Sequence, residues 1–307
     1  MIRIVTLTGA DNSIFPGDLK EVSASFPFVE WGILVSRKSM GINRFPNMGW
    51  LMQLSVIKKE MPEMKLSCHL CGAYVREILM GNDSVMRELG PEIWNMFSRV
   101  QINTHGEPHD FNPDAMIALM RQHPEKEFIF QFDNVNEKLL QAAVNGQVHQ
   151  YSTLFDMSHG AGVLPGRWPM PIQNVRCGYA GGLSPENLKA QIELIEDKVG
   201  ELEIWIDAET HVRSDNDKLF DLEKCKTFLQ IAEEHMKAAI PKRGVVTLSD
   251  KQKEFATHIG CEVALKDGGT GINMGLYFPE SWAEDGILKA NGVNVFFPKQ
   301  NKIYVQN

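Results

Sequence analysis

The sequence predicts a closed (β/α)8 barrel over residues 1–239, followed by a small β-rich appendage over residues 240–307. Three observations predict this fold: eight short apolar runs, amphipathic stretches between most of them, and a repeat of about 29 residues. An eight-fold count over this length is typical of a barrel, which needs about 200–250 residues. An open α/β sheet is the alternative, although no GxGxxG motif follows the first run to support a dinucleotide-binding sheet.

Each predicted strand is a short run of apolar and often β-branched residues. The eight runs are 2–7, 28–35, 64–70, 99–103, 127–132, 151–155, 175–179 and 202–206. Helices are expected between them, and the residues that would share one helical face in NLKAQIELIEDKV are Leu188, Ile192, Ile195 and Val199. If the barrel closes, the first run pairs in parallel with the last.

The rhythm changes from about residue 240. Gly and Pro punctuate short strand-like runs such as VVTL, INMGLYF and VNVFF, and aromatic residues are too frequent for a disordered tail. We therefore expect residues 240–307 to form a β-rich unit packed on the barrel. The KDGGTG segment within it lacks the Lys-Ser/Thr of a phosphate loop and is expected to be a hairpin turn.

Composition narrows the class of protein. The net charge is −8, with 39 acidic and 31 basic residues and no dense basic block, so nucleic-acid binding is not expected. No apolar stretch is long enough for a signal peptide or a membrane span, so we expect a cytoplasmic protein without membrane contact. The five cysteines do not suggest a disulfide framework, and the CxxC of Cys68 and Cys71 is expected to be a pair of packed thiols.

The last third of the predicted barrel carries a family resemblance. Asp156 ends the sixth run, GGLSPEN follows the seventh at 181–187, and IDAETHVRSDNDKLFDLEK follows from the eighth. In this order the segments resemble phosphoribosylanthranilate isomerase, and VTLTGAD, the region of Ser39 to Arg44 and VQINTHG are weaker matches. The resemblance covers about residues 1–235. It implies a (β/α)8 barrel that acts on a phosphorylated ribose derivative, with Asp156 at the general-acid position.

The turn at Gly181 and Gly182 is a candidate phosphate site. Loops after strands seven and eight of such barrels frequently bind phosphate. Glycines allow close approach of backbone N–H groups, and a helix N-capped by Ser184 with Pro185 at its first position would direct its dipole at the anion. We assign this role to Gly181, Gly182, Ser184 and Thr210. The alternative is a strand-to-helix turn that only needs positive φ.

Two departures from the family pattern affect the chemistry. The resemblance places the family's general-base Cys at Thr8, whose hydroxyl is a poor base near neutral pH. It places the family's SSG turn at 209–211, where Glu209 would repel a phosphate unless it points away or binds another group. Both changes argue against the family's own isomerisation.

Further polar residues lie at or just beyond the predicted strand ends, and so share one rim of the barrel. They are His69, Asn103, His105, Asp133, Asp156, His159, Asp207, Glu209 and His211. Such a set serves acid–base chemistry or holds a divalent metal, but no motif such as HExxH is present and no metal is expected. His105 and His159 are candidates to replace the missing base, although His159 also suits an exposed loop.

The sequence thus favours a diverged barrel that binds or isomerises a small phosphorylated, ribose-like compound without a cofactor. Asp156, Thr8, His159 and His105 are the catalytic candidates, and Arg44, with Asp207 and Glu209, is expected to hold the substrate. One alternative is a barrel that binds a ligand or a protein without turnover. The other is a metal-dependent lyase or hydrolase using the His and carboxylate rim. A homodimer is left open.

Overall fold

The computed structural model describes residues 1–105, 107, 109–132, 136–148, 150–156, 158 and 161–236, and the backbone of 237–239, 294–296 and 304–306. The chain divides into two compact units, Met1–Met236 and Lys237–Asn307. In the second unit, β11 (Asn294–Phe296) pairs antiparallel with β12 (Tyr304–Gln306). The remainder of the predicted appendage, including KDGGTG, lies outside the described residues.

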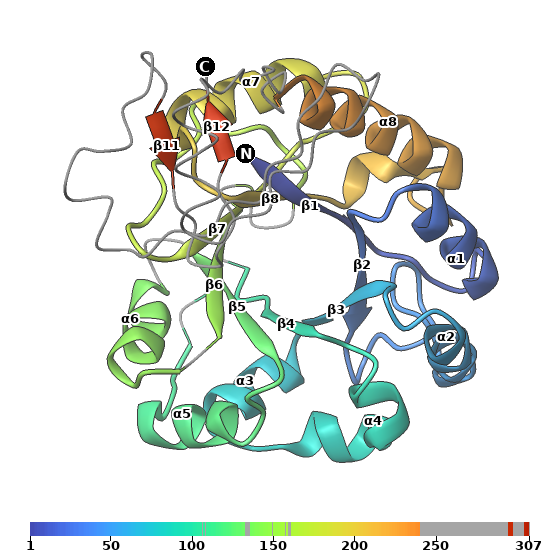
Figure 1. Ribbon diagram of the computed structural model, residues 1–307. Helices are drawn as coiled ribbons and strands as arrows, with labels where there is room; N and C mark the ends of the chain where they lie inside the picture. Colours follow the sequence, from blue (N-terminus) through green and yellow to red (C-terminus); the bar gives the residue numbers. More distant parts are fainter. Residues whose placement is uncertain are drawn as a thin grey trace, which may run out of the picture. The chain divides into compact units, whose positions relative to one another are not determined.

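The first unit is a closed barrel of eight parallel strands in the order β1 to β8, surrounded by helices (Figure 1). The strands are β1 Ile2–Thr8, β2 Val29–Val35, β3 Lys65–Leu70, β4 Arg99–Ile102, β5 Glu127–Phe132, β6 Tyr151–Asp156, β7 Arg176–Ala180 and β8 Ile204–Ala208. The first strand pairs in parallel with the last, from Ile2 opposite Ile204 to Leu7 opposite Ala208. This pairing confirms the predicted barrel and excludes the open sheet.

Most strands are followed by helices that cover the outside of the barrel. The helices are α1 Pro16–Ser25, α2 Met48–Glu60, α3 Ala73–Leu79, α4 Ser84–Trp94, α5 Pro113–Arg121, α6 Glu137–Asn145, α7 Leu188–Val199 and α8 Leu222–Ala239. Two helices follow β3, whereas the described residues between β6 and β7 contain none. That connection contains Pro165, Pro169 and Pro171, and proline removes a backbone donor that a helix interior requires. None of the described helices is both long and apolar enough to cross a membrane.

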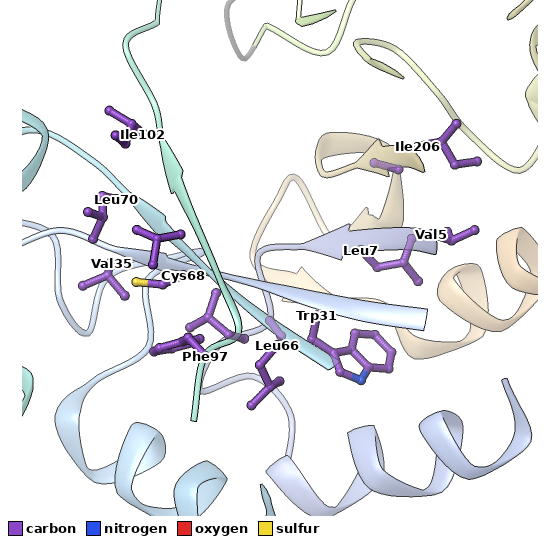
Figure 2. Packing of buried hydrophobic residues seen from close by; sticks show 14 of the residues in the cluster. Val5, Leu7, Trp31, Val35, Leu66, Cys68, Leu70, Phe97, Ile102 and Ile206 are labelled. Atoms are coloured by element: carbon purple, nitrogen blue, oxygen red, sulfur yellow. The ribbon is translucent and has the colours of Figure 1, made fainter. Parts of the chain in front are cut away.

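The outward faces of the strands pack on the helices. Figure 2 shows Trp31, Leu66 and Phe97 lying between strands and helices, and all three are buried. The indole Nε1 of Trp31 donates to the hydroxyl of Ser23 on α1 at 2.9 Å, so its polar atom is satisfied inside the apolar layer. Cys68 lies in the same outward layer as a free, buried thiol.

The inward faces of the strands form stacked layers, because alternate residues of each strand point into the barrel. At the amino-terminal end, Arg99 bridges Glu30 at 2.9 Å and Glu127 at 3.1 Å, and Arg176 pairs with Glu127 at 3.1 Å. This network has two charges of each sign, with Arg99 and Glu30 buried and Glu127 and Arg176 partly buried. The guanidinium of Arg99 also lies 4.2 Å from the centre of the Trp205 ring, which closes the network from above.

An apolar layer separates this network from the carboxyl end of the barrel. It consists of Ile4, Ile129, Leu154, Ala180 and Trp205. On three of the strands that contribute to it, the next inward residue toward the carboxyl end is polar: Gln131 on β5, Asp156 on β6 and Asp207 on β8. The barrel therefore places a polar layer at the end where (β/α)8 barrels carry their sites.

Gly178 of β7 makes room for Trp205, which gives a test of this interior packing. A Cβ at Gly178 would lie 2.1 Å from the indole Cε2 of Trp205. We expect Gly178→Ala to lower the free energy of unfolding by about 1–3 kcal/mol, because the buried ring must move. Urea unfolding measures this loss. Gly166→Ala, where a Cβ meets nothing within 4 Å, is the control, and equal stability of the two variants would contradict the proposed packing.

Candidate active site at the barrel mouth

A cavity opens at the carboxyl ends of the strands. Its described lining is acidic and polar, and contains neither Lys nor Arg. The residues are His69, Gln101, Asn103, His105, Gln131, Leu154, Asp156, Ser158, Gly162, Ala180, Gly181, Gly182, Leu183, Asp207, Ala208, Glu209, Thr210 and His211. Most of the sequence-predicted rim residues therefore meet in one place. Asp133 and His159 lie outside the described residues.

Thr8 and Asp207 form a buried pair on neighbouring strands. The Thr8 hydroxyl donates to Oδ1 of Asp207 at 2.9 Å, and Thr8 itself is 1% exposed. Gly32 makes this arrangement possible, because a Cβ there would lie 2.2 Å from the Thr8 hydroxyl and 2.9 Å from Nε2 of His69. Thr8 is not among the described lining residues. The Thr8 hydroxyl thus donates its hydrogen bond to Asp207, and Asp207 does line the cavity.

Asp207 has an unusual electrostatic environment. Burial raises the pKa of its carboxyl well above the usual value. The hydrogen bond from Thr8 opposes this shift, and the nearby carboxyls of Glu209, Glu30 and Asp156 add to it. The surroundings of Asp207 therefore favour the neutral acid, which can donate a proton or a hydrogen bond into the cavity.

Asp156 ends β6, as the sequence predicts, and is positioned by three donors. Its Oδ2 accepts from Nε2 of Gln131 at 3.0 Å, and its Oδ1 accepts from the backbone N–H and the hydroxyl of Ser158 at 3.1 and 2.7 Å. The Oε1 of Gln131 accepts in turn from the backbone N–H of His105 at 2.8 Å. These bonds fix the carboxylate in the cavity wall and connect it to the loop after β4.

The turn after β7 has the backbone that the glycines suggest. Gly181 and Gly182 have φ of 111° and 67°, conformations that residues with a Cβ rarely adopt. A Cβ at Gly182 would also lie 2.3 Å from the backbone nitrogen of Leu164. The loop before β7 therefore packs directly on this turn, which supplies a structural reason for Gly182 beside any ligand role.

The start of α7 differs from the prediction. The helix begins at Leu188 with Asn187 at its N-cap, whereas the sequence suggests Ser184 as the cap. The backbone N–H of Ser184 donates to Oδ1 of Asn187 at 3.0 Å, and Nδ2 of Asn187 donates to the carbonyl of Gly182 at 2.8 Å. Because Asn187 occupies this N–H, the turn over 184–187 is closed by its own side chain and the regular helix starts after it.

Glu209 and Arg44 bind each other at the edge of the mouth. Nη1 of Arg44 donates to Oε1 of Glu209 at 2.5 Å, and its Nε donates to Oδ2 of Asp217 at 2.6 Å. Arg213 joins the cluster through Asp11 at 2.8 Å and Asp217 at 2.8 Å. Arg44, the predicted substrate clamp, therefore already has two carboxylate partners. It is not among the described lining residues of the cavity. Burial raises the pKa of Glu209, and Arg44 opposes this rise.

The histidines of the lining have different environments. His105 is exposed with a φ of 52°. The exposed His211 has its Nε2 2.9 Å from the carbonyl of Gly162, a distance at which a ring N–H donates. His69 is 1% exposed, and burial, with a smaller effect from Arg99, lowers its pKa to about 3. In the described part of the chain, no group of three or more His, Cys, Asp or Glu side chains could hold a metal ion.

Gln101 and Gln131 are polar lining residues that the sequence did not single out. Each lies two residues before a predicted rim residue, Asn103 after β4 and Asp133 after β5. Since side chains two apart on a strand share a face, the inward period of two is the signal that would have found them.

No family model matches this chain, and no curated protein matches it. Among solved structures, phosphoribosylanthranilate isomerase from Thermotoga maritima is 16% identical and the match covers 76% of this chain and 99% of that one, with a TM-score of 0.48. 3-Hexulose-6-phosphate synthase from Salmonella typhimurium is 12% identical, and the match covers 76% of this chain and 99% of that one, with a TM-score of 0.43. A putative spore coat polysaccharide biosynthesis protein E from Chromobacterium violaceum is 11% identical, and the match covers 84% of this chain and 81% of that one, with a TM-score of 0.48. Scores below 0.5 at such identities carry no argument about activity, and the barrel rests on its own strand pairing.

The shifted pKa of Asp207 predicts how stability depends on pH. Because the folded pKa is raised, the folded state keeps this proton to higher pH than the unfolded state. The corresponding stability is present below about pH 4 and is lost as pH rises toward the folded pKa. Asp207→Asn has no such loss. We therefore expect its free energy of unfolding to rise relative to wild type between about pH 4 and pH 7, by at most about 1.4 kcal/mol per pH unit.

Urea unfolding of both proteins across this range measures the difference. The control is Asp197→Asn, because a hydrogen bond from Lys198 lowers the pKa of the exposed Asp197 and so predicts no relative gain with rising pH. A constant difference between wild type and Asp207→Asn would mean that the buried carboxyl ionises as easily as an exposed one.

Proposed function

We propose that the barrel binds a small phosphorylated, sugar-like compound and moves a proton on it, as a diverged relative of phosphoribosylanthranilate isomerase. The observation that carries this proposal is the double-glycine turn of Gly181 and Gly182, which lines the same cavity as Asp156 and Asp207. An anion-binding turn and two carboxyl groups would then act on the two ends of one ligand.

Backbone N–H groups supply the proposed phosphate contact. Successive N–H groups in a turn with positive φ form an anion-binding nest. Within the described part of the chain, the N–H groups of Gly182 and Leu183 have no acceptor among the backbone and side-chain hydrogen bonds. The neighbouring α7 adds the partial positive charge of its amino terminus.

The carboxyls near this turn repel an anion less than their number suggests. The pKa values of Asp207 and Glu209 are both raised, mainly by burial, and Glu209 is paired with Arg44. Their effective negative charge toward a phosphate is therefore reduced. This pairing resolves the repulsion that the sequence predicts for a carboxylate in place of the family's serine.

The proposed proton transfer uses Asp156 and Asp207. Asp156 presents a carboxyl held by donors, whereas the surroundings of Asp207 favour its neutral form. Two carboxyls in different environments are a usual arrangement for an acid and a base in one site. In this proposal the neutral carboxyl of Asp207 donates a proton and the carboxylate of Asp156 accepts one, so neither step needs Thr8, and a positioned group of this kind contributes about 10²–10⁴-fold to a rate.

Phosphate binding at the glycine turn is directly testable. We expect wild type to bind inorganic phosphate by calorimetry and Gly181→Ala to bind it at least about tenfold more weakly, because the new Cβ strains a backbone with φ of 111° and faces the carbonyl of Val163 at 3.2 Å. Gly200→Ala is the matched control, since Gly200 also has positive φ but lies at the far end of α7 with nothing within 4 Å. Equal phosphate affinity in all three proteins would leave the turn a purely structural feature.

The family's own reaction provides a second test. We expect no measurable conversion of phosphoribosylanthranilate by wild type, because Thr8 stands in place of the family's base and its hydroxyl donates to Asp207. Thr8→Cys should introduce activity that Asp156→Asn removes again. A fluorescence assay of turnover measures both. Robust turnover by wild type that Asp207→Asn leaves intact would contradict the role proposed for Asp207.

A further inference from the structure

Gln101 of β4 is a buried carboxamide whose acceptor has no partner. The side chain lines the cavity and the residue is 4% exposed. Its Oε1 receives no hydrogen bond from any described residue, although both hydrogens of its Nε2 have acceptors. Buried carbonyl oxygens in folded proteins are normally bonded, so an unpartnered Oε1 on a side chain that lines the cavity points to a donor that a ligand brings.

A series of hydrogen bonds from Gln101 to His69 determines that Oε1, and not Nε2, is the unpartnered end of the Gln101 carboxamide. Nε2 of Gln101 donates to Oδ1 of Asn103 at 2.7 Å, Nδ2 of Asn103 donates to Sγ of Cys71 at 3.5 Å, and Cys71 Sγ donates to the carbonyl of His69 at 3.8 Å. A backbone carbonyl can only accept, so the chain runs in one direction from Gln101 to His69. With Asn103 oriented so that its Nδ2 donates to Cys71, reversing the carboxamide of Gln101 would place its Oε1 against Oδ1 of Asn103.

The protonation states of Cys71 and His69 support this direction of the hydrogen bonds. Burial raises the pKa of the Cys71 thiol to about 12, so it remains an S–H donor at neutral pH. Burial also lowers the pKa of His69 to about 3, so its ring is neutral. Nδ1 of His69 is 3.3 Å from Nε2 of Gln101 and acts as the second acceptor, which leaves Nε2–H of His69 to donate to the hydroxyl of Ser67 at 2.8 Å.

We propose that Oε1 of Gln101 is a specificity determinant that accepts a hydrogen bond from an O–H or N–H group of the ligand, and that Cys71 is a positioning residue for it. The inference deepens the proposed function and rests on it. The ligand is then a phosphorylated compound with a hydroxyl or amino group that reaches the wall formed by β4, and not a phosphorylated hydrocarbon. A site built around such an acceptor discriminates strongly against an analogue that lacks the donor.

The test compares three phosphate esters of similar length on the full chain by calorimetry. Ribose 5-phosphate has hydroxyl donors, 5-aminopentyl phosphate has an ammonium donor, and pentyl phosphate has no donor on its chain. We expect wild type to favour at least one donor-bearing ester over pentyl phosphate by at least about tenfold, and the favoured ester identifies the donor. Equal affinity for all three esters in wild type overturns the inference without any variant.

Variants locate the preference. Gln101→Met keeps the length of the side chain but removes the acceptor, and should reduce the preference to within about threefold of none. Cys71→Ala, which breaks the chain, should reduce it in the same direction, and Cys71→Ser, which keeps a donor and an acceptor, should restore it. Cys68→Ala is the matched control, because Cys68 is a buried thiol in the outward apolar layer and should lose stability without any change in preference.

The outcomes separate this inference from the proposed function. If wild type binds neither inorganic phosphate nor any of the esters, both fail together. If phosphate binds and the preference is present but survives Gln101→Met, the glycine turn stands and the role of Gln101 is overturned. If Gln101→Met does not fold, Cys71→Ala against Cys71→Ser decides, and equal preference in these two variants overturns the chain.

Discussion

The parallel pairing of β1 with β8 is the constraint on which the rest of the barrel depends. Once the sheet closes, every strand must place alternate side chains in a narrow interior, and polar side chains there have to find partners within it. The lower part meets this requirement with the ion network around Arg99, which has equal numbers of opposite charges. Trp205 then closes this region, with space provided by Gly178.

The upper part does not reach the same balance. Its described lining includes three carboxyl groups and three carboxamide side chains but neither Lys nor Arg. The carboxyl groups therefore have no cationic side chain beside them in the lining. Two effects reduce the repulsion between these carboxyl groups. The pKa values of Asp207 and Glu209 are raised, and Arg44 forms an ion pair with Glu209 at the edge of the cavity. An interior that is neutral at one end and rich in acceptors at the other suits a fold whose chemistry lies at the carboxyl ends of its strands.

The fold could be predicted because strand spacing is a local property of the sequence. The same is true of Asp156 at the end of β6 and of the positive φ of Gly181 and Gly182. Partners could not be predicted, because they come from loops far apart in the chain. Arg44, the predicted substrate clamp, binds Glu209, 165 residues away, and Thr8 donates to Asp207, 199 residues away.

The Thr8 pairing also bears on the resemblance to phosphoribosylanthranilate isomerase, whose general-base Cys aligns with Thr8. A hydroxyl is a poor base, but one that donates to a buried carboxyl changes the properties of that carboxyl instead. It partly offsets the effect of burial and so limits how far the pKa of Asp207 rises. Gly32 is necessary for this geometry, since any side chain there would occupy the position of the hydroxyl. A threonine at this position is therefore compatible with the proposed acid–base chemistry, in which Asp207 on the neighbouring β8 takes part.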